Sequence, residues 1–268
     1  ATSVLTFWPN GDEPLFGLRA TYTPGKGLRD TYRPTPLADV THRVTQMQQD
    51  GFTVGSAGVL EPGDLRFSAS GGSDENYAVA LSVGLDRDFQ IDAVIEDFAN
   101  DGSVGLTGDP TPNSARWMAG GRMRFLDQNN GDPFSLSGRV LGGRDLETLD
   151  VGQLFLSFPM SYQVNEQLTV HVEPKATAFG NTRIGGLGIG ANYEIFDGLQ
   201  LIGEVTPVSE GNNPVWAAGM RYDMPNAGFS VDLSATNSIG RHGAGTLVAQ
   251  DSTRFGIGVS FVTGAFKR

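Results

Sequence analysis

The sequence predicts an all-β fold: a transmembrane, antiparallel, up-and-down β-barrel of about 12 strands, preceded by a small N-terminal β-α-β element. From about Asp64 onward, segments alternate apolar and polar side chains, which is typical of strands whose two faces meet different environments. Clusters of Gly, Asn, Asp and Pro separate the segments and leave no room for crossover helices, so neighbouring strands should be antiparallel. Aromatic residues gather at the ends of the segments, where the interfaces of a membrane barrel carry them.

The lengths of the segments favour a membrane barrel over a soluble sandwich. A spanning strand tilted by about 45° needs roughly 9–11 residues, whereas the modal soluble strand has about 5–6. The predicted strands are 64–71, 76–85, 89–98, 116–126, 134–143, 152–162, 168–177, 185–194, 199–208, 215–223, 229–237 and 253–261. Proline at positions 159, 174 and 207 argues against this assignment, because proline removes a ladder donor, and a soluble β-rich domain stays open as an alternative.

The two faces of these strands differ in polarity. One face is apolar, as in Tyr77, Val79 and Leu81, and we expect it to contact lipid. The other face is polar, and we expect it to line the lumen. The charged residues assigned to the lumen are Asp92, Glu96, Arg122, Arg124, Arg139, Glu173, Lys175, Glu204, Arg221, Asp232 and Arg254.

The connections alternate in length, as in bacterial barrels with short periplasmic turns and longer outside loops. Short links are expected at 86–88, 127–133, 163–167, 195–198 and 224–228, and the links between them include the long loops 99–115 and 238–252. Twelve strands then place both ends of the barrel on the short-turn side, which is the periplasmic side in such proteins.

Residues 1–61 form a separate element from the barrel of residues 62–268. A strand is expected over 15–23, an amphipathic helix over 36–50 and a second strand over 52–60. A unit of this size is too small for a good core of its own. It can cap the periplasmic mouth, plug the lumen or bind a periplasmic protein partner.

Composition excludes several classes of protein. The chain has 268 residues, no Cys, and 19 basic against 30 acidic residues, which gives a net charge of −11. It therefore carries no disulfide framework or thiolate metal site, and its acidity argues against nucleic acid as a partner. No apolar run approaches the roughly 18 residues of a transmembrane helix. Residue 1 is Ala, which fits a mature chain after removal of a signal peptide.

Over residues 64–261 the chain resembles Gram-negative outer-membrane β-barrel proteins. Residues 254–261, RFGIGVSF, are similar to the terminal strand of such barrels, with an apolar stripe that ends in Phe261. The chain departs from that pattern because seven residues, 262–268, follow the aromatic residue. The resemblance is to an architecture, and it implies location in the bacterial outer membrane, with the lipid bilayer as a partner.

The mixed charges of the lumen favour a narrow, porin-like channel for small polar or charged solutes. Opposed rows of acids and bases set a transverse field that filters solutes, although the same charges can pair off and fill the lumen. If Tyr222 pairs with Phe229, Arg221 lies diagonal to Asp232. A structural or assembly barrel, in which residues 1–61 dock a partner, is the alternative function.

Catalysis is the least favoured function. A hydrolase at the rim could use His242 with Asp251 or Ser238, but no enzyme motif supports it, and a solvated loop histidine explains His242 better.

Two short runs resemble cofactor-binding or metal-binding motifs but do not complete them, so we expect no cofactor and no metal. Residues 186–190, GLGIG, lack the following helix of a dinucleotide loop and are better explained as small residues on a crowded inner strand face. Residues 127–132, DQNNGD, resemble a calcium loop but contain Asn130-Gly131, which is a hairpin turn signal.

Overall fold

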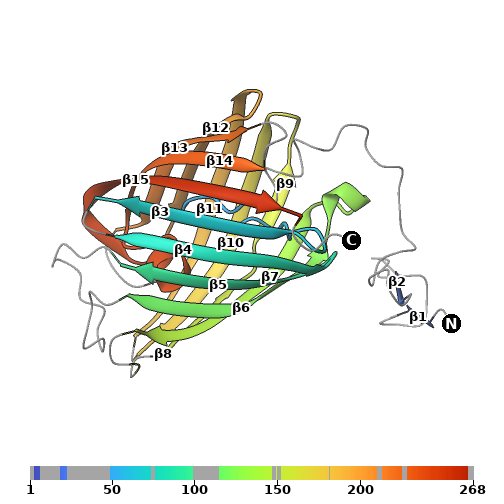
Figure 1. Ribbon diagram of the computed structural model, residues 1–268, viewed down its shortest axis with the longest axis horizontal. Helices are drawn as coiled ribbons and strands as arrows, with labels where there is room; N and C mark the ends of the chain where they lie inside the picture. The colour runs from blue at the N-terminus through green and yellow to red at the C-terminus, as the bar shows by residue number, and fades with distance from the viewer. Residues whose placement is uncertain are drawn as a thin grey trace.

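The computed structural model describes residues 3–6, 19–22, 49–73, 76–98, 115–146, 149, 152–180, 182–209, 213–224 and 228–264. Two short strands, β1 (Ser3–Thr6) and β2 (Arg19–Tyr22), pair with each other in an antiparallel sheet. All the other strands of the described residues belong to one antiparallel sheet that closes on itself (Figure 1).

The closed sheet is a barrel of 12 strands, as the alternation predicts. It contains 13 ladder segments, because β8 and β9 are two halves of one strand interrupted around Pro159. The last strand pairs with the first, with Gly258 opposite Ser70, and this pairing closes the barrel. The strands are β3 (Leu65–Gly72), β4 (Tyr77–Asp86), β5 (Phe89–Asp97), β6 (Arg116–Leu126), β7 (Ser135–Asp145), β8 (Gly152–Ser157), β9 (Met160–Gln163), β10 (Leu168–Phe179), β11 (Thr182–Phe196), β12 (Leu199–Thr206), β13 (Val215–Met224), β14 (Phe229–Ser238) and β15 (Ala249–Thr263).

The prolines interrupt the ladder without breaking the barrel. Pro159 separates β8 from β9, which both pair with β7 and β10. Pro174 lies within β10, where its carbonyl accepts a hydrogen bond from the N–H of Phe158 at 2.9 Å. A proline lacks the backbone N–H donor but keeps its carbonyl acceptor, so the neighbouring strand can still donate a hydrogen bond to it.

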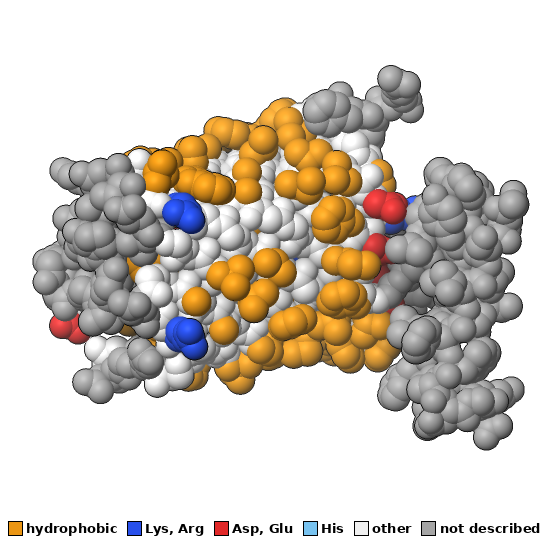
Figure 2. All heavy atoms as spheres, turned by 90° about the horizontal axis from the view of Figure 1, so that it is seen from below, with side chains coloured by type: hydrophobic (Ala, Val, Ile, Leu, Met, Phe, Trp, Pro, Cys, Tyr) orange, Lys and Arg blue, Asp and Glu red, His pale blue; other side chains and the backbone are white. Residues whose placement is uncertain are grey.

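The outer wall is apolar between the two ends of the barrel (Figure 2). Large apolar side chains on alternate strand positions are exposed, among them Ile189 (46% exposed) and Leu233 (52% exposed). The intervening positions face inward and are buried. No helix among the described residues is long and apolar enough to cross a membrane. An exposed apolar belt on a closed sheet is the architecture of a transmembrane barrel, in which lipid covers the belt.

We expect Ile189→Arg to destabilise the barrel by about 2–4 kcal/mol, the cost of an arginine at the bilayer midplane. Ile189 lies near the middle of β11 and points outward. Urea titration of the protein in lipid vesicles measures the change, with Ile189→Leu as the control. Equal stabilities of the two variants would show that this face does not contact lipid.

The structure corrects the expected N-terminal element. Residues 52–60 form no strand, although a strand was expected there; they are an irregular, buried segment inside the barrel. Arg19–Tyr22 is a strand within the range 15–23, as expected. The helix expected over 36–50 falls outside the described residues except for Gln49 and Asp50, which are not helical.

The register of β13 and β14 also differs from the expected one. Tyr222 pairs with Val231 and not with Phe229, so Arg221 lies directly opposite Asp232. Strand β13 continues two residues beyond Tyr222, so that Met224 pairs with Phe229 and the link is shortened to residues 225–228, which shifts the register by two residues.

Candidate functional site: the closed lumen

The lumen of the barrel is occupied by residues 49–60, here called the lumenal segment. Phe52, Val54, Ala57 and Leu60 are each at most 2% exposed. The two ends of the segment lie at the short-turn end of the barrel, because Gln49 Nε2 donates to Asp223 at the end of β13 and the N–H of Leu60 donates to Gln90 at the start of β5. The segment therefore enters and leaves the lumen at the same end.

Small residues on the barrel wall make room for the lumenal segment. Gly186, Gly188 and Gly190 face inward from β11, and a Cβ atom at Gly188 would lie 3.0 Å from Val54 Cγ2. The expectation of small residues on a crowded inner face over 186–190 is confirmed. Gly188 and Gly190 therefore leave space for Val54 of the lumenal segment, whereas Gly186 lies against Leu247.

Two wall carboxylates hold the main chain of the segment. Glu204 accepts hydrogen bonds from the N–H groups of Phe52 (2.9 Å), Thr53 (2.6 Å) and Val54 (3.3 Å) and from Thr53 Oγ1 (2.8 Å). Glu173 accepts from the N–H of Gly55 at 2.8 Å. These donors have no β-ladder to join, so the buried carboxylates supply the acceptors that a neighbouring strand would otherwise provide.

Wall cations hold the carbonyl groups of the same segment. Arg122 Nη1 donates to the carbonyls of Ser56 and Gly58, both at 3.1 Å. Lys175 Nζ donates to the carbonyl of Thr53. Arg221 Nη2 donates to the carbonyl of Asp50 at 2.9 Å. The wall charges therefore recognise the backbone of the segment and do not simply pair across neighbouring strands.

Asp50 adds a side-chain contact to this network. Its Oδ2 lies 2.6 Å from Arg122 Nη2 and 3.3 Å from Arg139 Nη1, and its Oδ1 accepts from the N–H of Ser56 at 2.9 Å. Burial opposes ionisation of Asp50, but Arg122 and Arg139 together hold the pKa of its carboxyl well below the usual range. Asp50 is therefore an anion bound between two guanidinium groups.

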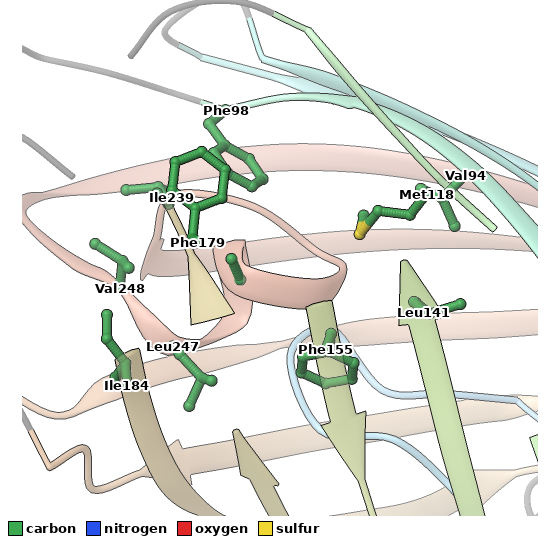
Figure 3. Packing of buried hydrophobic residues seen from close by; sticks show 11 residues of the cluster. Val94, Phe98, Met118, Leu141, Phe155, Phe179, Ile184, Ile239, Leu247 and Val248 are labelled. Atoms are coloured by element: carbon green, nitrogen blue, oxygen red, sulfur yellow. The ribbon is translucent and has the colours of Figure 1, made fainter. Parts of the chain in front are cut away.

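The other end of the lumen is filled by residues 239–248, here called the inner loop, which connects β14 to β15. The loop contains the 3₁₀ helix η2 (Gly243–Leu247) and packs against inward-facing apolar side chains (Figure 3). Glu96 accepts hydrogen bonds from the N–H groups of Arg241 and His242. The apolar residues packed together are Val94, Phe98, Met118, Leu141, Phe155, Phe179, Ile184, Ile239, Ala244, Leu247 and Val248.

His242 is a half-buried residue of this inner loop, so the expectation of a solvated loop histidine is wrong. Burial and the nearby charges of Arg139 and Arg241 lower the pKa of His242 to about 3. Ser238 Oγ, one of the possible partners of His242 in a rim hydrolase, lies 2.6 Å from the carbonyls of Gly240 and Gly245 and donates to the loop backbone. The geometry therefore gives these groups a structural role.

We expect acid to loosen the inner loop. His242 is neutral in the lumen, and outside it the imidazole regains its ordinary pKa of 6.5, so protonation below pH 6.5 favours the released loop. The free energy of loop release should fall by about 1.4 kcal/mol for each pH unit between pH 6.5 and pH 3. Amide exchange of residues 243–247 measured at pH 7 and pH 5 checks it. Exchange that stays equally acid-sensitive in His242→Gln would contradict the assignment.

Ten of the 11 charged residues assigned to the lumen are buried in the barrel interior. Arg124 is the exception in position: it lies at the short-turn rim, where its guanidinium contacts Asp88 (3.1 Å) and Asp127 (2.8 Å). The others lie along the interior, where Asp92 contacts Arg139 (3.1 Å) and Asp232 contacts Arg241 (2.8 Å). The ten buried residues are Asp92, Glu96, Arg122, Arg139, Glu173, Lys175, Glu204, Arg221, Asp232 and Arg254.

Sequence reasoning missed Asp50 and the inner loop as parts of the site. A signal for the lumenal segment was present: residues 55–58 are Gly-Ser-Ala-Gly between apolar neighbours, a run that fits a confined space. The turn at 127–132, by contrast, is built as its sequence indicates. Asp127 accepts from the N–H of Asn129 at 3.0 Å, and Gly131 has a φ of 95°, so these residues cap a turn.

A cavity of about 90 Å³ remains between the lumenal segment and the wall formed by β15, β3 and β4. It follows β3 for most of its length, past Arg66, Ser68 and Ser70 and their partners on β4. Apart from Arg66, the side chains along this wall are small, and the cavity is also lined by Arg139, Arg221 and Arg241 from other parts of the barrel interior. The closed lumen thus keeps a narrow space along one wall.

Comparisons with known proteins support the fold. No protein-family model matches the chain, and no curated protein matches it in sequence. The KdgM porin, solved in complex with disordered oligogalacturonate, is similar in structure, with a TM-score of 0.52 and 9% identity over 74% of this chain and 98% of that chain. The COG4313 outer membrane channel from Pseudomonas putida F1 has a TM-score of 0.51 and 9% identity, over 77% and 98%. The chain therefore has the fold of outer-membrane β-barrel channels.

Proposed function

We propose that this protein is an outer-membrane channel for small polar or charged solutes, and that the lumenal segment closes it in the state described. The observation that carries the proposal is that the lumen is filled by a connecting segment and not by the barrel's own strands. The sheet pairs strand to strand from β3 to β15 and takes no hydrogen bond partner for its ladder from residues 49–60. Because the lumenal segment makes no hydrogen bonds with the strand ladder, it can withdraw from the lumen while the sheet keeps its barrel shape.

The wall of β15, β3 and β4 is the proposed path for solutes. Its inward positions beside the cavity carry Ser68, Ser70, Ala78, Ala80, Ser82 and Ser260 together with Arg66, so withdrawal of the lumenal segment widens the existing cavity along this wall. Polar hydroxyl groups and guanidinium groups on facing sides suit hydrated, polar solutes. The structural similarity to channel proteins supports the same function.

Liposome swelling tests the function. Vesicles that carry the chain without residues 1–60, and so without the lumenal segment, should swell in solutions of small neutral sugars and amino acids and should not swell in large oligosaccharides. Vesicles with the protein unfolded by heat are the control for leakage. Solute uptake equal to that of the control at every solute size would reject a channel.

The second candidate is a non-conducting barrel that presents its N-terminal residues to a periplasmic partner. Gln49 lies at the short-turn end, so the 48 residues before it are attached there. Affinity capture with the full chain, compared with a chain that lacks residues 1–48, separates the two functions. A specific partner that requires residues 1–48, together with no solute uptake, would favour this candidate.

A further inference from the structure

We propose that Arg122, Arg139 and Arg221 form a carboxylate-binding site for the solute, and that Asp50 occupies this site in the closed state. The inference rests on the proposed function and specifies its substrate class as small hydroxylated carboxylates. In this view the lumenal segment closes the channel partly by offering its own carboxylate in place of the carboxylate of a solute.

The geometry around Asp50 is that of a built anion site. Arg122 and Arg139 approach Asp50 Oδ2 at 2.6 Å and 3.3 Å, and Ser56 donates to Oδ1 through its N–H (2.9 Å) and its hydroxyl (3.3 Å). A third guanidinium, that of Arg221, lies at the same residue, because its Nη2 donates a hydrogen bond to the main-chain carbonyl of Asp50 at 2.9 Å. Guanidinium groups match the planar geometry of carboxylates, and such charge-assisted bonds are the strong ones.

The arginines retain donors that Asp50 does not use. Arg122 Nε and Arg221 Nη1 are buried and have no hydrogen-bond partner among the described residues. A buried guanidinium donor without an acceptor is unfavourable, because it has lost its hydrogen bonds to water. A ligand with further oxygen atoms, such as hydroxyls next to its carboxylate, can supply the missing acceptors.

Space for such a ligand lies directly beside the site. The cavity of about 90 Å³ is lined by Asp50, Arg139 and Arg221 and by Arg66, Ser68 and Ser70 of β3. Carboxylate recognition at the arginines and hydroxyl contacts at the serines fit one small hydroxy acid. The cavity alone is too small for a large solute, so a larger one requires the segment to withdraw.

The charge balance of the wall favours an anion once the segment leaves. Asp92 already contacts Arg139, and Asp232 already contacts Arg241. Withdrawal of the segment removes Asp50, the carboxylate nearest to Arg122. Of the three arginines, Arg139 still contacts Asp92, and the net positive charge of the cluster attracts an anion.

Binding of glucuronate, with glucose as its neutral counterpart, tests the site in the full-length protein. Asp50→Asn frees the arginines and keeps the shape of the side chain, so it should bind glucuronate about tenfold or more tightly than the unmodified chain, as expected for release of a competing charge-assisted contact. Asp251→Asn is the matched control, because Asp251 is an exposed residue of β15 that accepts a hydrogen bond from Asn213 at 3.4 Å. Isothermal titration in detergent micelles measures the affinities.

Loss of glucuronate binding when Arg122→Gln is added to Asp50→Asn would support the assignment. Equal binding of glucuronate and glucose, or tight binding that survives Arg122→Gln, would overturn it. Bilayer currents of the same proteins separate this inference from the proposed function. Glucuronate binding without any current would support the site and reject the channel, whereas currents without glucuronate binding would reject the site alone.

Discussion

A chain that lacks residues 1–60 is expected to conduct roughly tenfold or more current than the full-length chain, because the deletion empties the short-turn part of a 12-stranded lumen and leaves only the inner loop inside it. Every strand of the barrel pairs within residues 65–263, so the deletion removes no ladder hydrogen bond from the closed sheet. It removes Phe52 and Val54, which fill the lumen beside β11 and β12. Single-channel recording in planar bilayers measures the change.

A shorter deletion provides the control for this experiment. A chain that lacks only residues 1–48 keeps the lumenal segment and all its contacts with the wall, so its conductance should stay at the level of the full chain. If both truncated chains conduct equally, the lumenal segment does not close the barrel. If neither conducts while both remain folded, the inner loop alone is sufficient for closure.

The substitution Glu204→Gln should release the lumenal segment. The Glu204 carboxylate accepts from Phe52, Thr53 and Val54, and a glutamine in its place offers one acceptor oxygen and turns an NH₂ group toward donors. Breaking a buried charged contact of this kind costs about 3–5 kcal/mol. Amide exchange at residues 52–54 should therefore accelerate by roughly 10²–10³-fold, because each 1.4 kcal/mol is a factor of ten.

Glu194→Gln is the matched control for this substitution. Glu194 lies near the end of the adjacent strand β11 and accepts from the N–H of Gly198 at 3.0 Å, in the turn between β11 and β12. Exchange at residues 52–54 should be unchanged in this variant. Equal protection in Glu204→Gln and Glu194→Gln would show that the carboxylate does not anchor the segment.

The barrel strands were predictable because their signal is local. Ile189, Leu187 and Tyr193 alternate with inward residues along β11, and lipid on one side and a polar lumen on the other impose the same period of two on every strand. The alternation of short and long links then predicted which connections lie at the same end of the barrel. The position of the charged residues on inward strand faces follows from the same period.

The filled lumen was not predictable from these patterns. Residues 52–60 resemble a strand because apolar side chains recur in them, but their N–H and carbonyl groups bind Glu204, Glu173 and Arg122 and not another strand. The periodicity of apolar residues indicates which side chains are buried. It does not indicate which groups form hydrogen bonds with the backbone N–H and carbonyl groups. Inward apolar residues such as Met118 and Phe155 were missed for a related reason, since only the folded inner loop gives them an apolar partner.

A reversible lock of the lumenal segment tests the central claim most directly. An ideal Cβ at Gly190 would lie 3.6 Å from Val54 Cβ, within the usual Cβ–Cβ range of disulfides, and the chain has no Cys of its own. We predict that the full-length Val54→Cys, Gly190→Cys protein passes no current when oxidised and regains the current of the unmodified chain when a reductant is added. Equal currents before and after reduction, with the disulfide verified by mass spectrometry, would contradict closure of the channel by residues 49–60.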